Sequence, residues 1–310
     1  MAHDHAHAHG ARGADTRRLA VALGLILLFM AFEVAMAVVA SSLALLSDAA
    51  HMLTDAAALG LAIFAARLAA RPARGAMTYG LGRAEILSAQ VNGATLIVLA
   101  GFIVYEAIVR LVSPPEVRGG VVLIVAVVGV VVNLLASAVL AGGSAKRSLN
   151  VEGALQHVLN DLYAFVATAL AGLIVLLTGF DRADPVASLL VATLMLRSGI
   201  LLLVKSGRVF LEAAPEGVDP DAIGRDLAAQ PGVIEVHDLH VWEVTSGFPA
   251  LSAHVVVRPG DDCHAVRREL AQRVRDRFDI EHTTLQVDHE TRGGLIDIET
   301  APAGAAHPSE

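Results

Sequence analysis

Long apolar runs separated by short polar segments dominate the first two thirds of the chain. A membrane-spanning helix needs about 20 apolar residues, and six runs reach that length. They are residues 19–40, 43–69, 84–112, 121–141, 151–179 and 185–204. The segments "RPARG", "SPPEVRGG", "GGSAKRS" and "GFDRADP" fall between runs and are typical of helix ends and loops. The pattern predicts an α-helical membrane domain of six transmembrane helices over residues 19–210.

The pattern changes after residue 210. "DPDAIGRDLAAQ" and "CHAVRRELAQRVRDRF" have the pattern of short amphipathic helices, and "GVIEVHDLHVWEV", "PALSAHVVVR" and "HTTLQVDHE" alternate as strands do. The order αββαβ predicts a small α+β domain over residues 211–292, which is small enough that dimerisation would help to stabilise it. Residues 1–18 are rich in histidine, and we expect them to form a flexible tail. We expect residues 293–310 to be disordered.

Composition and charge support a membrane domain joined to a soluble one. Charged residues make up 17% of the chain, against about 25% in a soluble domain. From Leu211 onward there are 8 basic and 19 acidic residues (−11), which leaves 15 basic and 12 acidic residues (+3) before it. The absence of a basic stripe argues against nucleic-acid binding. The absence of a G-x-x-x-x-G-K-[ST] motif argues against a nucleotide-driven pump.

Basic residues are unevenly divided between the two sets of loops. One set consists of the amino terminus, the loops after the second and fourth runs, and the exit of the sixth. It holds Arg12, Arg17, Arg18, Arg67, Arg71, Arg74, Arg83, Lys146, Arg147, Lys205 and Arg208. The opposite loops hold little beyond Arg118 and Arg182. Because basic loops stay on the cytoplasmic side, we expect a multi-pass protein of the cell (inner) membrane with both termini in the cytoplasm.

Two matching motifs place ionisable residues inside the apolar runs. "HMLTD" carries His51 and Asp55 in the second run, and "HVLND" carries His157 and Asp161 in the fifth. A spacing of four puts each pair on one helix face, and two such pairs could form a four-ligand site of two nitrogens and two oxygens, which suits zinc. Each histidine could instead bond its own aspartate and serve local packing. An intramembrane zinc protease is a weaker reading, because neither motif has the glutamate of H-E-x-x-H.

The remaining chemistry lies mainly in the polar region after residue 210. Its histidines are His237, His240, His254, His264, His282, His289 and His307. The single cysteine, Cys263, excludes an intrachain disulfide and a thiolate zinc cluster. The histidines near the amino terminus could collect zinc weakly or could be the relic of an expression tag.

These motifs together resemble the cation diffusion facilitator family, in its six-span zinc-exporting form. The matching segments are "SLALLSDAAHMLTDAAALGLA", "YGLGRAEILSAQVNG", "GALQHVLNDLYAF", "DPVASLL", "SGRVFLEAAPEGV", "VHDLHVWEVTSG", "LSAHVVV" and "HTTLQVDHE", and the resemblance runs from Leu19 to Glu290. It implies a secondary active transporter and not an enzyme. Such a protein exports Zn²⁺, with Cd²⁺ or Co²⁺ as lesser substrates, in exchange for protons by alternating access. His51, Asp55, His157 and Asp161 would form its transport site between the second and fifth helices.

The same resemblance implies a homodimer whose cytoplasmic domain has a metallochaperone-like fold and binds metal. Matching motif to motif, its ligands would be His237, His254, His282 and Asp288, with His240 and His289 in reserve. The loop "ARPARGAMTYGLGRAE" has no histidine or aspartate, so we expect no metal site there. The alternative function is a metal sensor that no longer transports.

Overall fold

The computed structural model describes residues 5–40, 43–112, 119–142, 148–180 and 182–290. The chain forms two compact units. The first comprises residues 1–215 together with 242–249, and the second comprises residues 216–241 and 250–310. Each unit is described separately below.

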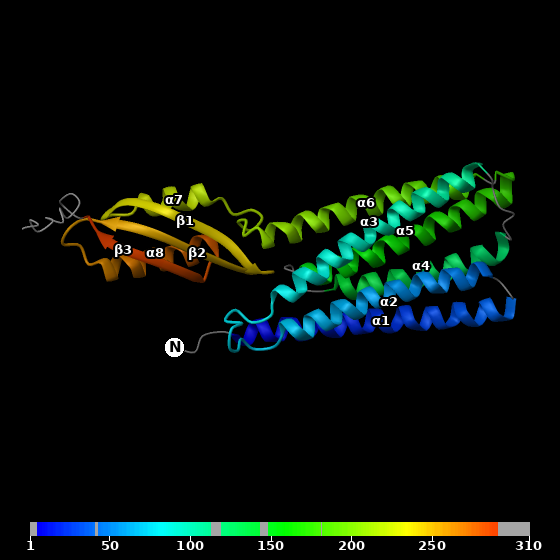
Figure 1. The fold of residues 1–310 in the computed structure, drawn as a ribbon, viewed down its shortest axis with the longest axis horizontal. Coiled ribbons are helices and arrows are strands. Elements are labelled where there is room, and N and C mark those ends of the chain that lie inside the picture. The colour runs from blue at the N-terminus through cyan, green and yellow to red at the C-terminus, as the bar shows by residue number, and fades with distance from the viewer. Residues whose placement is uncertain (1–4, 41–42, 113–118, 143–147, 181, 291–310) are drawn as a thin grey trace, which may run out of the picture. The chain divides into compact units, whose positions relative to one another are not determined.

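The first unit is built from six long helices, which lie side by side in Figure 1. They are α1 (His5–Ala40), α2 (Leu43–Ala69), α3 (Arg83–Val112), α4 (Gly119–Ala141), α5 (Leu149–Thr178) and α6 (Ala183–Phe210). Among the described residues, α1, α3, α4, α5 and α6 each contain a stretch long and apolar enough to cross a membrane. The first turns of α2 have side chains outside the described residues. The predicted helical membrane domain is confirmed.

Two helix ends differ from those predicted. Helix α1 begins at His5, whereas the first span was predicted to begin at Leu19 after a flexible tail. Alanine favours helix strongly, and the segment before Leu19 contains four alanines in ten residues from His5 to Ala14, so the backbone helix continues into it. Helix α6 extends to Phe210, beyond the predicted end at Val204. The predicted disordered tail, residues 293–310, lies outside the described residues.

Small residues let α3 and α6 approach closely. A Cβ atom built on Gly199 would lie 2.8 Å from the carbonyl oxygen of Gly93 and 2.8 Å from Cγ1 of Ile97. A Cβ atom on Gly93 would in turn lie 3.1 Å from the carbonyl oxygen of Gly199. Membrane helices pack mainly by van der Waals contact, so such paired glycines favour a close crossing.

Helix α5 contacts the five other helices of the unit, α1, α2, α3, α4 and α6. Asn150 Nδ2 donates to the carbonyl oxygen of Ala62 on α2 at 2.7 Å. Lys205 Nζ on α6 donates to Glu152 Oε1 at 2.8 Å. A Cβ atom on Gly153 would meet Leu202 at 3.1 Å and the α3 backbone at 3.7 Å. These contacts fix the first turns of α5, the helix that carries "HVLND".

Residues 242–249, a hairpin tip, belong to the first unit. The Nε of Arg83 donates to the carbonyl oxygen of Val244 at 3.0 Å. The backbone N–H of Leu149 donates to Ser246 Oγ at 3.2 Å, and the ring of Tyr79 meets Phe248 edge to face. The tip therefore packs against the starts of α3 and α5.

The second unit has the predicted αββαβ order. Its elements are α7 (Pro220–Ala228), β1 (Val233–Thr245), β2 (Phe248–Val257), α8 (Cys263–Phe278) and β3 (His282–His289). The sheet order is β1-β2-β3, and β2 pairs with β3 in parallel, with His254 opposite Gln286. Parallel strands need a long crossover connection, which α8 provides. The two helices are joined by Asp226 of α7, which accepts hydrogen bonds from Arg273 and Arg277 of α8, and the hydrogen bond from Arg273 lowers the pKa of this carboxyl.

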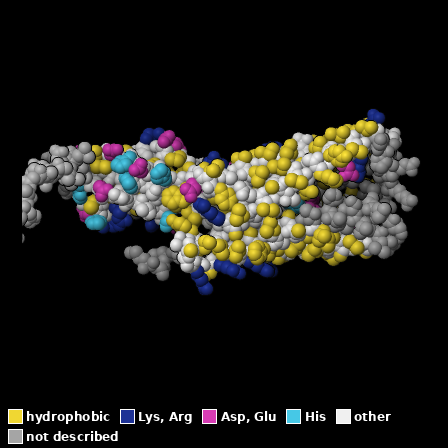
Figure 2. All heavy atoms as spheres, viewed as in Figure 1, with side chains coloured by type: hydrophobic (Ala, Val, Ile, Leu, Met, Phe, Trp, Pro, Cys, Tyr) yellow, Lys and Arg dark blue, Asp and Glu magenta, His cyan; other side chains and the backbone are white. Residues whose placement is uncertain are grey.

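The side-chain types on the two units differ. Figure 2 shows hydrophobic side chains over most of the visible face of the helical unit. Histidine and acidic side chains gather on the visible face of the α/β unit. An apolar outer surface is what a lipid-facing helical bundle requires.

The close crossing of α3 and α6 predicts a specific destabilising substitution. Gly199→Ala puts a methyl group against the α3 backbone and should cost about 1–3 kcal/mol of stability, as overpacking does. Thermal unfolding in detergent, followed by loss of the monodisperse gel-filtration peak, should show a lower midpoint. Gly207→Ala on the same helix is the control, because its Cβ would meet nothing within 4 Å. Equal midpoints for the two variants would contradict the close crossing.

Candidate metal centres

An aspartate and a histidine from different helices meet inside the helical unit. Asp55 Oδ1 of α2 lies 2.7 Å from His157 Nε2 of α5. The His157 side chain is 2% exposed and that of Asp55 is 15% exposed. Each HxxxD motif could have paired within its own helix, but His157 hydrogen-bonds to the aspartate of the other motif.

The antiparallel register of α2 and α5 explains why these two residues meet. Asn150 lies seven residues before His157, and its partner Ala62 lies seven residues after Asp55. Seven residues are two turns, or about 10.5 Å of helix. The Asn150 hydrogen bond therefore fixes the same register that sets Asp55 opposite His157.

Asp161 completes a cluster of three possible ligands. One ligand atom from each of Asp55, His157 and Asp161 lies within 4.8 Å of the other two. The fourth predicted ligand, His51, lies on the α2 backbone one turn before Asp55, but its side chain is outside the described residues. Asn160, the polar residue immediately before Asp161, is buried, with 1% of its surface exposed.

One imidazole nitrogen and two carboxylate oxygens suit a divalent metal. Zn²⁺ binds such atoms at about 2.0–2.2 Å, which sets tetrahedral ligands roughly 3.4 Å apart. The 2.7 Å contact between Asp55 and His157 would lengthen to reach that spacing, and all three ligand atoms already lie within 4.8 Å of one another. Ionisable residues inside membrane spans are rare, and they pair with one another or mark ion pathways. The donor set therefore fits a divalent cation.

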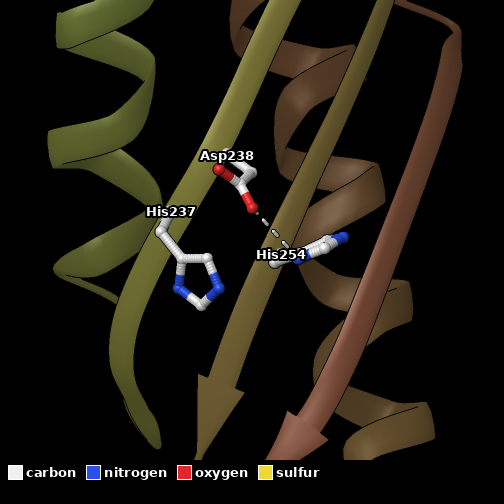
Figure 3. A group of neighbouring side chains, drawn as sticks. All are labelled: His237, Asp238 and His254. Carbon is white, nitrogen blue, oxygen red and sulfur yellow. Dashed lines mark ion pairs between the residues drawn. The ribbon is translucent and has the colours of Figure 1, made fainter.

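A second cluster lies on the sheet of the α/β unit. His237 and Asp238 come from β1 and His254 from β2, as Figure 3 shows, and their ligand atoms also lie within 4.8 Å of one another. His254 Nδ1 is 3.5 Å from Asp238 Oδ2, and the two histidine rings meet edge to face at 5.4 Å. All three side chains are exposed.

Asp238 is a possible ligand that the sequence analysis did not select. Successive residues of a regular strand point to opposite faces, so a neighbour of His237 would not be expected beside it. Asp238 has φ of 49°, in the left-handed region that non-glycine residues rarely adopt. This local irregularity lets neighbouring residues on β1 take part in one cluster. The signal available in the sequence was the adjacent His-Asp pair in "VHDLHVW".

Of the other predicted ligands of this unit, His240 lies beside the cluster and the rest lie elsewhere on the sheet. His240 lines a pocket of about 300 Å³ together with Asp238 and His254. His282 begins β3 opposite Ala250, and Asp288 is opposite Val256. His254 is opposite Gln286, so His282 is four register positions away, or about 13 Å. His289 Nε2 lies 2.9 Å from the carbonyl oxygen of Asp261. The structure thus brings His237 and His254 together but does not group His282 and Asp288 with them.

The chain is similar along most of its length to known metal transporters. Residues 19–211 match the family described as "Cation efflux transmembrane domain", and residues 215–290 match "Cation efflux protein, cytoplasmic domain".

Three curated relatives cover almost the whole chain. The "Zinc transporter ZitB" of Escherichia coli (strain K12) is 40% identical over 94% of this chain and 93% of its own. The "Metal cation efflux system protein CzcD" of Cupriavidus metallidurans is 40% identical over 91% and 89%. The "Cadmium, cobalt and zinc/H(+)-K(+) antiporter" of Bacillus subtilis is 37% identical over 94% and 93%. With both of its domains matched and the buried Asp55–His157 pair between its helices, this chain belongs to the cation efflux family, also called the cation diffusion facilitators.

Proposed function

We propose that this protein is a secondary active transporter that exports divalent metal, chiefly Zn²⁺, from the cytoplasm in exchange for protons. Cd²⁺ and Co²⁺ are lesser substrates. Metal binds a tetrahedral site of His51, Asp55, His157 and Asp161 between α2 and α5. The site opens alternately to the two sides of the inner cell membrane, and both termini lie in the cytoplasm.

The buried contact between Asp55 and His157 carries this proposal. It joins the two HxxxD motifs across two helices at 2.7 Å, in an environment where an unused charge would be costly. The family and the names of the relatives support metal efflux as the task of such a site.

Competition between metal and protons supplies the coupling. Metal ligands must be deprotonated, so binding a divalent cation releases protons. Imidazole is the side chain whose charge ordinarily changes near neutral pH. When the site faces the more acidic side, protons displace the metal; when it faces the cytoplasm, metal displaces the protons. No nucleotide is needed for this cycle.

The transport site predicts the loss of activity in two single variants. In vesicles holding the purified protein and a pH gradient, Asp55→Ala and Asp161→Ala should each reduce Zn²⁺ uptake to the level of protein-free vesicles, because each removes an oxygen ligand. Uptake is followed with a zinc-sensitive dye inside the vesicles. Glu106→Gln is the matched control: Glu106 is a membrane-helix carboxylate paired with Arg110 on its own helix, and this variant should transport normally. Normal uptake in both aspartate variants would refute the site.

The counter-ion can be tested in the same vesicles. The name of the Bacillus subtilis relative includes K⁺ beside H⁺. Collapsing the pH gradient with a proton carrier while a K⁺ gradient is kept should stop Zn²⁺ uptake. Uptake that persists on the K⁺ gradient alone would contradict proton coupling. The alternative of a non-transporting sensor predicts no uptake under either gradient.

We further propose that the α/β unit binds metal and joins two copies of the chain as a homodimer. His237 and His254 are its main metal ligands, and His282 and Asp288 are the other ligands predicted from the sequence. Asp238 is a further candidate ligand because it lies beside His237 and His254. Metal bound here would favour the dimer state that binds it better, and so could bias transport by linkage.

The cytoplasmic site can be counted in a full-length protein whose transport site has been disabled. In an Asp55→Ala background, the combined change His237→Ala and His254→Ala should lower the bound zinc per chain, measured by elemental analysis after gel filtration. The control is His264→Ala on α8, which lies outside the cluster. An unchanged zinc content in the double variant would show that these histidines hold no metal.

A further inference from the structure

The face of α5 that carries the transport ligands continues into an aromatic residue. Phe165 follows Asp161 by four residues, so it lies one turn further along the same face. Under the proposed topology α5 runs from the cytoplasm outward. Phe165 is therefore the next side chain on that face on the extracytoplasmic side of the site.

Phe165 is held against two other helices. Its ring meets the buried ring of Phe29 on α1 edge to face, with centroids 5.7 Å apart and planes at 70°. On α4, a Cβ atom built on Gly129 would lie only 2.5 Å from Cδ1 of Phe165. The ring thus occupies space that exists because residue 129 has no side chain. It packs against the hydrophobic core cluster that also contains Val125 and Val158.

A carboxylate lies one turn past this aromatic contact on α1. Glu33 follows Phe29 by four residues and is 0% exposed. Consecutive spans alternate in direction, so α1 and α5 run the same way, and Glu33 lies further from the cytoplasm than Phe29. A buried acidic residue in a span pairs with a partner or marks an ion pathway. The Phe29–Phe165 contact therefore lies between the ionisable groups of the site and the next carboxylate outward.

We propose that the ring of Phe165, seated on Gly129 and Phe29, is the gate that closes the transport site on its extracytoplasmic side. The ring must leave this seat before metal can be released outward or protons can reach Asp161. An apolar ring suits this task, because a hydrated cation cannot pass it without losing water. This proposal rests on the proposed transport function, because it names the barrier on one side of the transport site.

Accessibility of a thiol placed below the ring tests the gate without requiring transport. Asp161→Cys is introduced after Cys263→Ser has removed the native cysteine. A charged, membrane-impermeant thiol reagent is then applied to right-side-out and inside-out vesicles. If the state closed by the ring dominates, the state open to the extracytoplasmic side makes up about 10% of the protein or less. Labelling from that side is then slow in the parent protein. Removing the ring should raise its rate by about tenfold or more.

Two variants should produce that rise and two controls should not. Phe165→Ala removes the ring, and Gly129→Ala displaces it from its seat. Gly172→Ala on α5 adds a methyl group where nothing lies within 4 Å, and Phe102→Ala removes an exposed ring from α3. Labelling from the cytoplasmic side should stay unchanged in all four, which shows that the protein remains folded.

The outcomes separate the gate from the proposed function. Unchanged extracytoplasmic labelling in both Phe165→Ala and Gly129→Ala overturns the gate, even where the parent protein transports Zn²⁺. Increased labelling in both, with unchanged controls, supports the gate even if the parent protein shows no proton-driven uptake, in which case the transport function fails on its own. Equal rises in the Gly172→Ala and Phe102→Ala controls would also overturn the gate.

Discussion

The placement of Asp55 against His157 inside an apolar helical unit is the constraint on which the helical unit depends. Leaving an ionisable group in the membrane without a partner is expensive, so α2 and α5 must hold a register that joins these two side chains. The Asn150 hydrogen bond to Ala62 fixes that register two turns away. The Lys205–Glu152 pair and the close approach at Gly153 then hold α5 against its neighbours. Close packing by small residues makes this support rigid without adding further charges.

Much of the architecture could be predicted because it follows from periodicity and length. Apolar runs long enough to span a membrane become helices, and alternation followed by an amphipathic helix becomes αββαβ. At the start of α7, Asp219 caps the helix by accepting from the N–H of Asp221, and Pro220 follows it in the first turn, which are the residue types expected there. The start of α1 could not be predicted, because an alanine-rich segment with many polar residues suits either a tail or a helix.

The side-chain clusters were predictable only where helix spacing determines them. Residues four apart share a helix face, so the two HxxxD motifs could be paired from the sequence alone. Grouping residues on a sheet depends instead on strand register, which the sequence does not display. His282 looked equivalent to His254, but the register sets His254 opposite Gln286, four positions from His282. Asp238 joined the cluster through a left-handed backbone angle, a feature that no hydrophobic pattern reports.

The proposed exchange of a metal ion for protons would place a demand on the surroundings of the site as well as on its ligands. Coupling fails if the site is open to both sides at once, so each side needs a barrier that can be withdrawn. A charged residue could not serve next to Asp161, since it would compete for the same cation or repel it. In the proposed gate, the aromatic ring next to the ligands would exclude water without binding metal, and the absence of a side chain at Gly129 leaves the space in which the ring sits. In the proposed transport cycle, Asp161 as a ligand and Phe165 as the barrier would therefore have complementary roles one turn apart on α5.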